Sequence, residues 1–408
     1  MKSKRVFPLL LVTKKAELSV KNGHPWVYFD EITDTFGEPE NGCIVDVVSA
    51  KGTYLGSGLY SAHSKIRVRL LSSNANDKYD DAFFARRLRY AIDCRHSIMG
   101  DDFSACRLVF GEADGLPGLT VDRFGDVCVT QVLSYGMDQR RDMLYAALES
   151  ILAEYGVALR GIYERNDVNL RELEGLEQYK GWYRPEAISD RSTVTQIVEN
   201  GIRYTVDFEN GQKTGFFLDQ KYNRLAVARM AKGRRVLDCF THTGSFALNA
   251  AMGGAAHVTA VDISQTAIDQ AKANAALNGL AERMDFLCTD VFDLLPELAA
   301  KSEKPYDFII LDPPAFTKSR KTVHSAERGY KEINYRAMKL LPRGGYFATC
   351  SCSHFMKNEL FLKMLREAAA DAGVQLRQLE ARQQCCDHPV LWNVPETDYL
   401  KFYLFQII

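Results

Sequence analysis

The stretch Val236-Leu237-Asp238-Cys239-Phe240-Thr241-His242-Thr243-Gly244 decides the fold that this sequence predicts. It begins as a buried strand and passes into a loop whose one glycine is Gly244, and a helix is expected to begin near Ser245. From Leu218 onward, strand-like and helix-like segments alternate, which is typical of a parallel sheet with helices on both faces. We expect strands at residues 235–239, 258–262, 284–288, 308–311 and 346–350, a helix at 265–277, and a terminal hairpin formed by 376–379 and 398–408. The prediction is an α/β, Rossmann-like fold with a mostly parallel sheet of seven strands.

Acidic residues follow three successive strands of this predicted sheet. Asp238 and Asp262 close the first two strands, and Asp290 follows the third. In such sheets a nucleoside binds beyond the carboxyl ends of the strands, where an acidic residue can hold the ribose hydroxyls. The loop that contains Thr243 and Gly244 lacks the repeated glycines of a dinucleotide pyrophosphate site. Because S-adenosylmethionine has no phosphate, we expect this cofactor ahead of NAD, although Asp290 is equally well suited to cap a helix.

Two further strand ends carry groups suited to chemistry on a base. Asp312-Pro313-Pro314 follows the fourth strand, and two prolines would hold the aspartate in a rigid turn. Cys350 is expected to end the fifth strand, with Cys352 two residues later. A thiolate here could add to C6 of a pyrimidine and activate C5 for methylation, while Asp312 binds N3 or the exocyclic amine and helps proton transfer. Cys350 is the first candidate nucleophile and Cys352 the second; an inert core cysteine and a purely structural turn are the alternatives.

The composition is that of a soluble globular protein. The 408 residues are 46% hydrophobic and 25% charged, and the net charge of −1 means that any surface for nucleic acid must be local. No stretch is long and apolar enough to span a bilayer, and the basic N-terminal segment lacks a signal-peptide cleavage site, so a cytoplasmic protein is expected. The ten cysteines are scattered through strand-like runs, which favours reduced thiols, and their spacings predict no metal site.

A chain of this length is expected to form two or three domains. The expected domains are residues 1–73, β-rich and RNA-binding; 74–190, a small α+β domain; and 191–408, the catalytic domain. In the first, Trp26 lies beside a turn and is either a core residue or an RNA-stacking platform. Arg67 and Arg69 alternate with apolar residues, as on a strand with a basic outer face.

The segment 318–343 is the most basic part of the chain. It holds eight Lys or Arg residues against two Asp or Glu residues, with tyrosines between them. Lys318, Arg320 and Lys321 are candidates for phosphate contacts, although an ordinary solvated helix would also carry such charges. The target base must leave its stack to reach a pocket, which favours single-stranded or loop RNA as the substrate.

Motifs along nearly the whole chain resemble the bacterial large-subunit ribosomal RNA methyltransferase I family. Two motifs are similar to its PUA domain: His24-Pro25-Trp26-Val27 and Gly56-Ser57-Gly58-Leu59-Tyr60. Residues 113–122 are similar to its central domain. The cofactor side of its catalytic domain is similar to Lys213-Thr214-Gly215-Phe216-Phe217-Leu218-Asp219-Gln220 together with Arg224. The resemblance implies S-adenosylmethionine-dependent formation of 5-methylcytosine in large-subunit ribosomal RNA. It also implies cofactor contacts from Lys213, Thr214, Phe217 and Arg224, and it maps the nucleophile of the Thr-Cys-Ser element to Cys350.

One departure from related enzymes bears on the mechanism. Many RNA cytosine-C5 methyltransferases carry a second cysteine after the Asp-x-Pro element, and Ala315 holds that position here. Product release would then need another group, such as Asp312 or Cys352. Two alternatives stay open: methylation of guanine or an exocyclic amine without a covalent step, and a nonenzymatic RNA-binding role in ribosome assembly. Homodimer formation is also left open.

Overall fold

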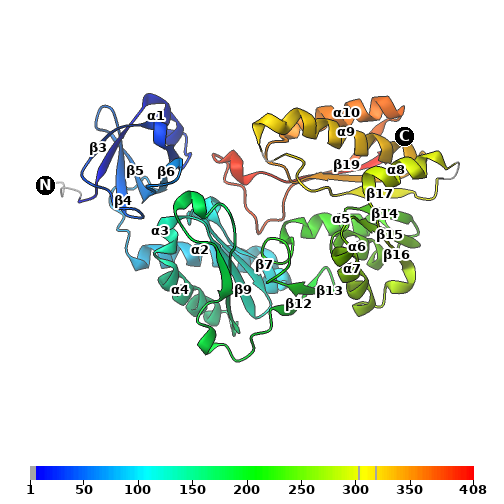
Figure 1. Ribbon diagram of the computed structural model, residues 1–408, viewed down its shortest axis with the longest axis horizontal. Coiled ribbons are helices and arrows are strands. Elements are labelled where there is room, and N and C mark those ends of the chain that lie inside the picture. The colour runs from blue at the N-terminus through cyan, green and yellow to red at the C-terminus, as the bar shows by residue number, and fades with distance from the viewer. Residues whose placement is uncertain (1–5, 302–303, 318) are drawn as a thin grey trace. The chain divides into compact units, whose positions relative to one another are not determined.

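A computed structural model describes residues 6–301, 304–317 and 319–408, and its chain divides into two compact units (Figure 1). The first unit comprises the chain up to Ile197 together with Val206–Leu218 and Cys386–Thr397. The second comprises Val198–Thr205, Asp219–Cys385 and Asp398–Ile408. The three domain boundaries expected from the sequence stay predictions. Within the described ranges, no helix is long and apolar enough to cross a membrane.

The first unit contains a mixed β-sheet near its N-terminal end. Among the described residues this sheet has six strands in the order β2-β6-β5-β4-β1-β3. Its elements are β1 (Leu9–Val12), α1 (Lys14–Lys21), β2 (Trp26–Tyr28), β3 (Ile32–Phe36), β4 (Ile44–Ser49), β5 (Tyr54–Tyr60) and β6 (Ile66–Ser72). Leu10, Val12, Val27 and Val68 are fully buried in its core. The first strand begins at Leu9, directly after Pro8, because proline has no N–H for the strand ladder.

A second sheet of the same unit has, in the part of the chain that is described, five strands in the order β11-β10-β9-β8-β7. Its elements are α2 (Asp81–Met99), β7 (Ala105–Phe110), β8 (Leu119–Phe124), β9 (Val127–Val132), α3 (Tyr135–Asp138), α4 (Arg141–Glu154), β10 (Gly161–Asn166) and β11 (Tyr179–Trp182). Asp80 caps α2 by accepting a hydrogen bond from the Phe83 N–H. The residues between β9 and β10 form two separate helices, α3 and α4.

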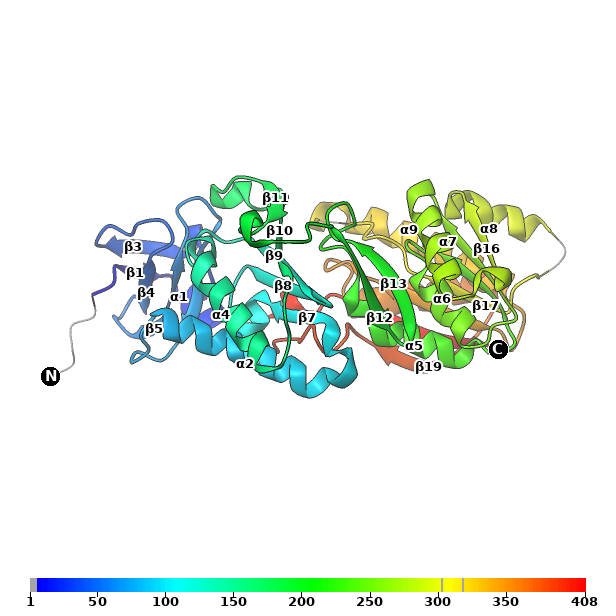
Figure 2. The ribbon, with the colours of Figure 1, turned by 90° about the horizontal axis from the view of Figure 1, so that it is seen from below.

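A hairpin of β12 (Val194–Glu199) and β13 (Ile202–Asp207) precedes the large sheet in sequence (Figure 2). The large sheet belongs to the second unit and, over the described residues, has seven strands in the order β16-β15-β14-β17-β18-β20-β19. Its strands are β14 (Arg235–Cys239), β15 (His257–Asp262), β16 (Met284–Cys288), β17 (Phe308–Leu311), β18 (Tyr346–Ser351), β19 (Leu376–Arg382) and β20 (Lys401–Ile407). The first five run parallel, and β20 pairs antiparallel with both β18 and β19. The predicted α/β fold and terminal hairpin are confirmed.

Helices cover both faces of this sheet (Figure 1). They are α5 (Lys221–Met230), α6 (Ser245–Met252) and α7 (Gln265–Leu277) on one face, and α8 (Val291–Ala300), α9 (Val323–Leu340) and α10 (Asn358–Ala372) on the other. The chain leaves β14 toward one face and β17 toward the other, so the strand order reverses between these neighbours. In open α/β sheets such a reversal leaves a crevice at the carboxyl ends of the strands, where ligands bind.

The end of β18 differs from the sequence prediction. Cys350 was expected to end this strand, which was wrong by one residue, because the ladder with β20 continues to the pair Ser351 and Lys401. Cys350 therefore lies within the sheet, opposite Phe402, and has no exposed surface. Cys352 is the first residue after the strand and is partly exposed.

Candidate functional site

Asp238 is the last residue but one of β14, next to the reversal point, and is fully buried. Its Oδ2 atom accepts hydrogen bonds from the Thr241 hydroxyl at 2.5 Å and from the Ala247 N–H at 2.9 Å. Its Oδ1 atom is buried and has no hydrogen-bond partner among the described residues. Burial raises the pKa of the Asp238 carboxyl from 3.8 to about 7 against the hydrogen bond from Thr241, and the charges of Asp312 and Asp262 raise it further. The Oδ2 atom of Asp238 is thus held in place by two donors, whereas its Oδ1 atom can accept a hydrogen bond from a ligand.

The loop from β14 to α6 has an unusual backbone. Phe240, His242 and Gly244 all have positive φ values, of 65°, 50° and 81°. A side chain at Gly244 would also place a Cβ atom 2.9 Å from the Cβ of Ala271, so glycine is required on both counts. Non-glycine residues in this conformation are concentrated at ligand sites, where the surrounding structure holds the strained backbone. The hydroxyl oxygen of Thr243 in this loop is a second buried atom without a partner in the described structure.

The other two predicted acids differ from each other in their contacts. Asp262 ends β15 and accepts hydrogen bonds at 2.9 Å from the backbone N–H groups of His242 and Ser264. It therefore ties the second strand to the β14 loop at the same sheet edge. Asp290 is the N-cap of α8 and accepts from the Phe292 N–H at 2.8 Å, which is the helix-capping alternative that the sequence left open. Its part in cofactor binding stays a prediction.

Asp312 follows β17 at the reversal point, as expected. Its Oδ1 atom accepts a hydrogen bond from the Gln220 side-chain amide at 3.1 Å, and Gln220 is in turn held by Asn223 at 2.6 Å. Although part of the residue is exposed, burial of the carboxyl raises its pKa to about 7, with a further increase from the charge of Asp219. A carboxyl with this pKa can both accept and donate a proton near neutral pH.

The two cysteines differ in their surroundings. Burial raises the pKa of the Cys350 thiol far above its ordinary value, and the charge of Asp312, which accepts a hydrogen bond from this thiol, adds to the increase. Burial also raises the pKa of Cys352, to about 12, and the charges of Asp312 and Asp219 act in the same direction. Only the charge of Lys401 and a backbone hydrogen bond oppose this increase for Cys352. All ten cysteines fall within the described ranges and are free thiols.

Asp219 is a site residue that the sequence did not single out. It follows directly on the quoted Phe-Phe-Leu run, but a lone acid outside a strand end carries little signal. Its Oδ2 atom accepts a hydrogen bond from the Tyr399 hydroxyl at 2.6 Å, and its backbone carbonyl accepts from the Cys385 N–H at 2.7 Å. Its Oδ1 atom is buried and has no partner in the described part of the chain.

The residues taken from the resemblance lie in different units. Lys213, Thr214 and Phe217 belong to the first unit, where the Thr214 hydroxyl donates to Asp122 at 2.6 Å. Arg224 belongs to the second unit, is almost fully buried, and pairs with Glu199 at 2.7 Å. These contacts give Thr214 and Arg224 structural roles, and cofactor contacts from all four residues stay predictions.

The predicted RNA-binding residues of the first unit contact other side chains of that unit. The Trp26 indole N–H donates to Glu112 at 3.1 Å, and Arg69 pairs with Glu174 at 2.8 Å. The Arg67 guanidinium donates to the Ser61 carbonyl at 2.6 Å and lies 4.6 Å from the centre of the Phe29 ring. RNA contacts from Trp26, Arg67 and Arg69 stay predictions.

The predicted basic segment is only partly described. Lys318 lies outside the described residues, and Arg320 begins a short 3₁₀ turn whose first side chain is likewise not described. Lys321 is exposed. On α9, Lys331 pairs with Asp371 at 2.8 Å, so acidic groups offset part of the basic charge that was counted from the sequence.

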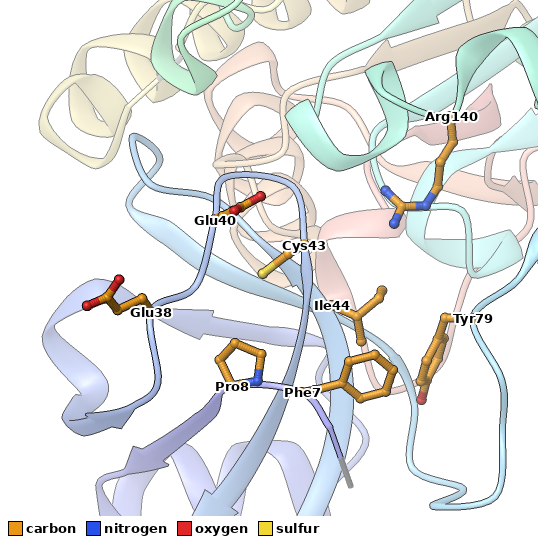
Figure 3. A pocket seen from close by; sticks show the side chains of 8 residues that line it. All are labelled: Phe7, Pro8, Glu38, Glu40, Cys43, Ile44, Tyr79 and Arg140. Atoms are coloured by element: carbon orange, nitrogen blue, oxygen red, sulfur yellow. The ribbon is translucent and has the colours of Figure 1, made fainter.

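A hollow of about 470 Å³ lies in the first unit (Figure 3). It is lined by Phe7, Pro8, Glu38, Glu40, Cys43, Ile44, Tyr79 and Arg140. Burial raises the pKa of the Cys43 thiol, which makes it a poor nucleophile, and Arg140 donates to the Gly136 carbonyl at 2.6 Å. None of the residues predicted for cofactor binding or catalysis lines this hollow, and nothing in its contacts indicates a reaction.

The second unit fits S-adenosylmethionine chemically. This cofactor combines a positively charged sulfonium and an ammonium with ribose hydroxyls and an adenine. Asp238, Asp262, Asp312 and Asp219 supply four carboxyl groups that influence one another at the reversal point. The buried oxygens of Asp238, Asp219 and Thr243 that have no partner among the described residues need donors of the kind that the cofactor carries.

Comparisons with known proteins agree with this geometry. Residues 175–405 match the family model of S-adenosylmethionine-dependent methyltransferases, and residues 10–73 match that of PUA-like domains. The ribosomal RNA large subunit methyltransferase I of Klebsiella pneumoniae strain 342 is 40% identical over 405 residues, which are 99% of each chain. That of Escherichia coli O139:H28 is 39% identical over 401 residues, 98% of this chain and 99% of the other.

Solved structures share the fold. A SAM-dependent methyltransferase from Streptococcus mutans superposes with a TM-score of 0.81 at 24% identity and covers 98% of this chain and 99% of its own. A methyltransferase solved in complex with SAH gives a TM-score of 0.83 with the same identity and coverage. Together with the carboxyl cluster at the reversal point, the matches establish that this chain belongs to the ribosomal RNA large subunit methyltransferase I family and is an S-adenosylmethionine-dependent methyltransferase.

Proposed function

We propose that this protein methylates C5 of a cytosine in large-subunit ribosomal RNA, and that Cys352 is its nucleophile. The ribosomal substrate is supported by relatives of about 40% identity that carry that name over their full length. The cytosine is supported by one observation above all: a partly exposed cysteine directly follows β18, next to the strand that leads to Asp312. We place the reaction in the cytoplasm, where ribosomal RNA of bacteria is modified.

The choice of Cys352 over Cys350 rests on access. A nucleophile must approach C6 of the base to bonding distance, and Cys350 is fully buried between β17 and β20. Cys352 lies beyond the last strand pair and keeps exposed surface. Both thiols respond to the charge of Asp312, so both lie near the same carboxyl, but only Cys352 meets the requirement for access.

Asp312 would move the protons that the reaction requires. Its carboxylate takes the proton of the Cys352 thiol and passes it to N3 of the cytosine, while the thiolate sulfur forms a bond to C6 and C5 becomes enamine-like. S-adenosylmethionine supplies an electrophilic methyl group on its sulfonium. With that methyl on C5, the ionised Asp312 accepts the C5 proton, and the bond between sulfur and C6 breaks to restore the C5–C6 double bond. The N3 proton returns to sulfur, so each turnover releases one proton. This assignment gives Asp312 the role of the cysteine that Ala315 replaces.

The exposed face of α9 is our proposal for contact with the RNA backbone. A surface hollow of about 530 Å³ there is lined by Arg328, Lys331, Glu332, Tyr335 and Asp371. This hollow and the exposed Lys321 provide cations that can contact phosphates and an aromatic ring on which a base can stack. Replacing Lys321 and Arg328 by alanine should weaken RNA binding. The dependence of affinity on salt should fall by about one unit of slope for each phosphate that the protein no longer neutralises.

The decisive experiment measures transfer of labelled methyl groups to ribosomal RNA by wild type, Cys352→Ala and Cys350→Ala. We expect labelled 5-methylcytidine from wild type and from Cys350→Ala, and none from Cys352→Ala. RNA that contains 5-fluorocytidine should trap a covalent complex, because fluorine at C5 cannot leave as a proton, and Cys352→Ala should form none. Loss of product in Cys350→Ala alone would assign the nucleophile to Cys350. Label on guanine, or on an exocyclic amine, would replace this proposal with methylation that needs no covalent step.

A further inference from the structure

Lys401 is a buried lysine at the sheet edge that holds the proposed nucleophile. It is the first residue of β20, and only 8% of it is exposed. Its ammonium donates a hydrogen bond to the backbone carbonyl of Ser353 at 2.7 Å. Removing an ammonium from water costs several kcal/mol unless it is compensated, so a lysine at this position calls for an explanation beyond packing.

The strand register places this lysine beside Cys352. Lys401 pairs with Ser351, the last residue of β18, and the next two residues of the chain are Cys352 and Ser353. The hydrogen bond to Ser353 therefore closes the turn that contains the thiol. The Ser353 carbonyl also accepts from the Met356 N–H at 3.2 Å, and the Ser353 hydroxyl donates to the Thr317 carbonyl at 3.0 Å, so Lys401 is the charged one among several restraints on this loop.

We propose that Lys401 is a positioning residue for Cys352. The ammonium of Lys401 holds the loop after β18 and stabilises the thiolate form of Cys352. The inference rests on the proposed function, because a thiolate is needed only if Cys352 attacks the base. A thiolate, and not a thiol, is the reactive form of cysteine, and a neighbouring cation is a common means of populating it.

The charges around the pair act in opposite directions, and Lys401 is the group that favours the thiolate. Burial lowers the pKa of Lys401 to about 8, and attraction to Asp398 and to the Cys352 thiolate opposes that decrease. In turn, the charge of Lys401 lowers the pKa of Cys352, whereas burial and the charges of Asp312 and Asp219 raise it. The Tyr330 hydroxyl is a further titratable group that responds to Cys352 and to Asp312. Among these groups Lys401 is the one cation, so its loss leaves the thiolate facing only acids.

The test measures the rate at which iodoacetamide alkylates Cys352 at pH 8. The sample is the full chain without RNA, and the product is quantified by mass spectrometry of the peptide that contains Cys352. Well below the thiol pKa the rate follows the thiolate fraction, so one unit of pKa is a tenfold change in rate. We expect Lys401→Met to slow alkylation of Cys352 about threefold or more. Lys401→Arg, which keeps the charge and a donor, should stay within twofold of wild type. Lys357→Met removes an exposed lysine near the same loop and should change nothing.

An unchanged rate in Lys401→Met, with a thermal melt like that of wild type, would overturn the inference. If Lys401→Met does not fold, Lys401→Gln takes its place, because glutamine keeps a donor for the Ser353 carbonyl and removes the charge; an unchanged rate in Lys401→Gln would equally refute a role for the charge. The assay needs neither RNA nor cofactor, so it separates two failures. Absence of 5-methylcytidine with a slowed Lys401→Met rejects the proposed function, whereas 5-methylcytidine with an unaffected Lys401→Met rejects only the role of Lys401.

Discussion

Asp238 should make the affinity for S-adenosylmethionine depend on pH. Without ligand, burial keeps the pKa of its carboxyl at about 7, and its Oδ1 atom has no partner in the described structure. A cationic ligand against this oxygen favours the ionised form, so binding must displace the proton wherever it is present. The apparent Kd is then multiplied by 1 + 10^(7 − pH), which is about 11 at pH 6 and about 1.1 at pH 8. The affinity should rise about tenfold over this range, or ~1.4 kcal/mol.

Titration calorimetry with S-adenosylmethionine at pH 6 and pH 8 measures this effect, with Asp238→Asn as the variant. Asparagine can keep its oxygen at the Oδ2 position, where Thr241 and the Ala247 N–H donate, but it places an NH2 group at the Oδ1 position. The affinity should therefore fall at both pH values, and the titration of this side chain is removed. The ratio of affinities at the two pH values should therefore be about tenfold smaller in the variant than in wild type. Groups that titrate on the cofactor itself contribute equally to both proteins and cancel.

A matched control is available in Asp46→Asn. Asp46 is also buried and accepts a hydrogen bond from Ser57 at 2.5 Å, but it belongs to the first unit. This variant should retain the pH dependence of wild type. The same ratio of affinities in Asp238→Asn and in wild type would refute the reasoning, because it would show that Asp238 does not release a proton when the cofactor binds.

Three further predictions concern stability. The Asp238 carboxyl has a raised pKa in the folded state, so the stability that its protonation contributes is fully present below about pH 4 and is lost as pH rises through 7. In urea unfolding, Asp238→Asn should therefore remove up to about 4 kcal/mol from the pH dependence of the free energy of unfolding. Gly244→Ala combines positive φ with a contact to Ala271 and should lower the unfolding free energy by about 1–3 kcal/mol in the same assay, with weaker cofactor binding by calorimetry. Arg224→Met removes the guanidinium that pairs with the buried Glu199 carboxylate and should lower the free energy of unfolding by about 3–5 kcal/mol in chemical denaturation, of which the double variant with Glu199→Gln should recover a part.

Local sequence signals were sufficient to predict most of the second unit. The strands at 235–239, 284–288 and 308–311 and the helix at 265–277 have the expected bounds, because apolar runs, Asn278-Gly279 and the Ser264 cap lie beside them in the chain. The acids at successive strand ends could likewise be placed from the sequence, since parallel strands bring their carboxyl ends to one edge.

Features that depend on distant parts of the chain were not predicted. The segment Cys386–Thr397 belongs to the first compact unit, and its attachment depends on contacts with residues far away in sequence. The backbone N–H of Arg107 donates to Asp387 at 2.8 Å, and the buried Arg95 guanidinium donates to the Asp387 carbonyl at 3.0 Å. Asp219 was missed for the same reason, because its partners Tyr399 and Cys385 lie more than 150 residues further along the chain.

Two cysteines, one within β18 and one just after it, explain why the sequence alone left the nucleophile open. Cys350 and Cys352 have the same chemistry and are two residues apart, so an extended chain would place both on the same face. What separates them is the partner strand, which comes from the far end of the chain and covers Cys350 with Phe402. The ladder ends at Lys401, and Cys352 is the first residue that it leaves uncovered. Strand β20 thus buries the Cys350 thiol and brings the cation of Lys401 to the Cys352 thiol. We expect the difference in reactivity between the two cysteines to disappear only in variants that alter β20.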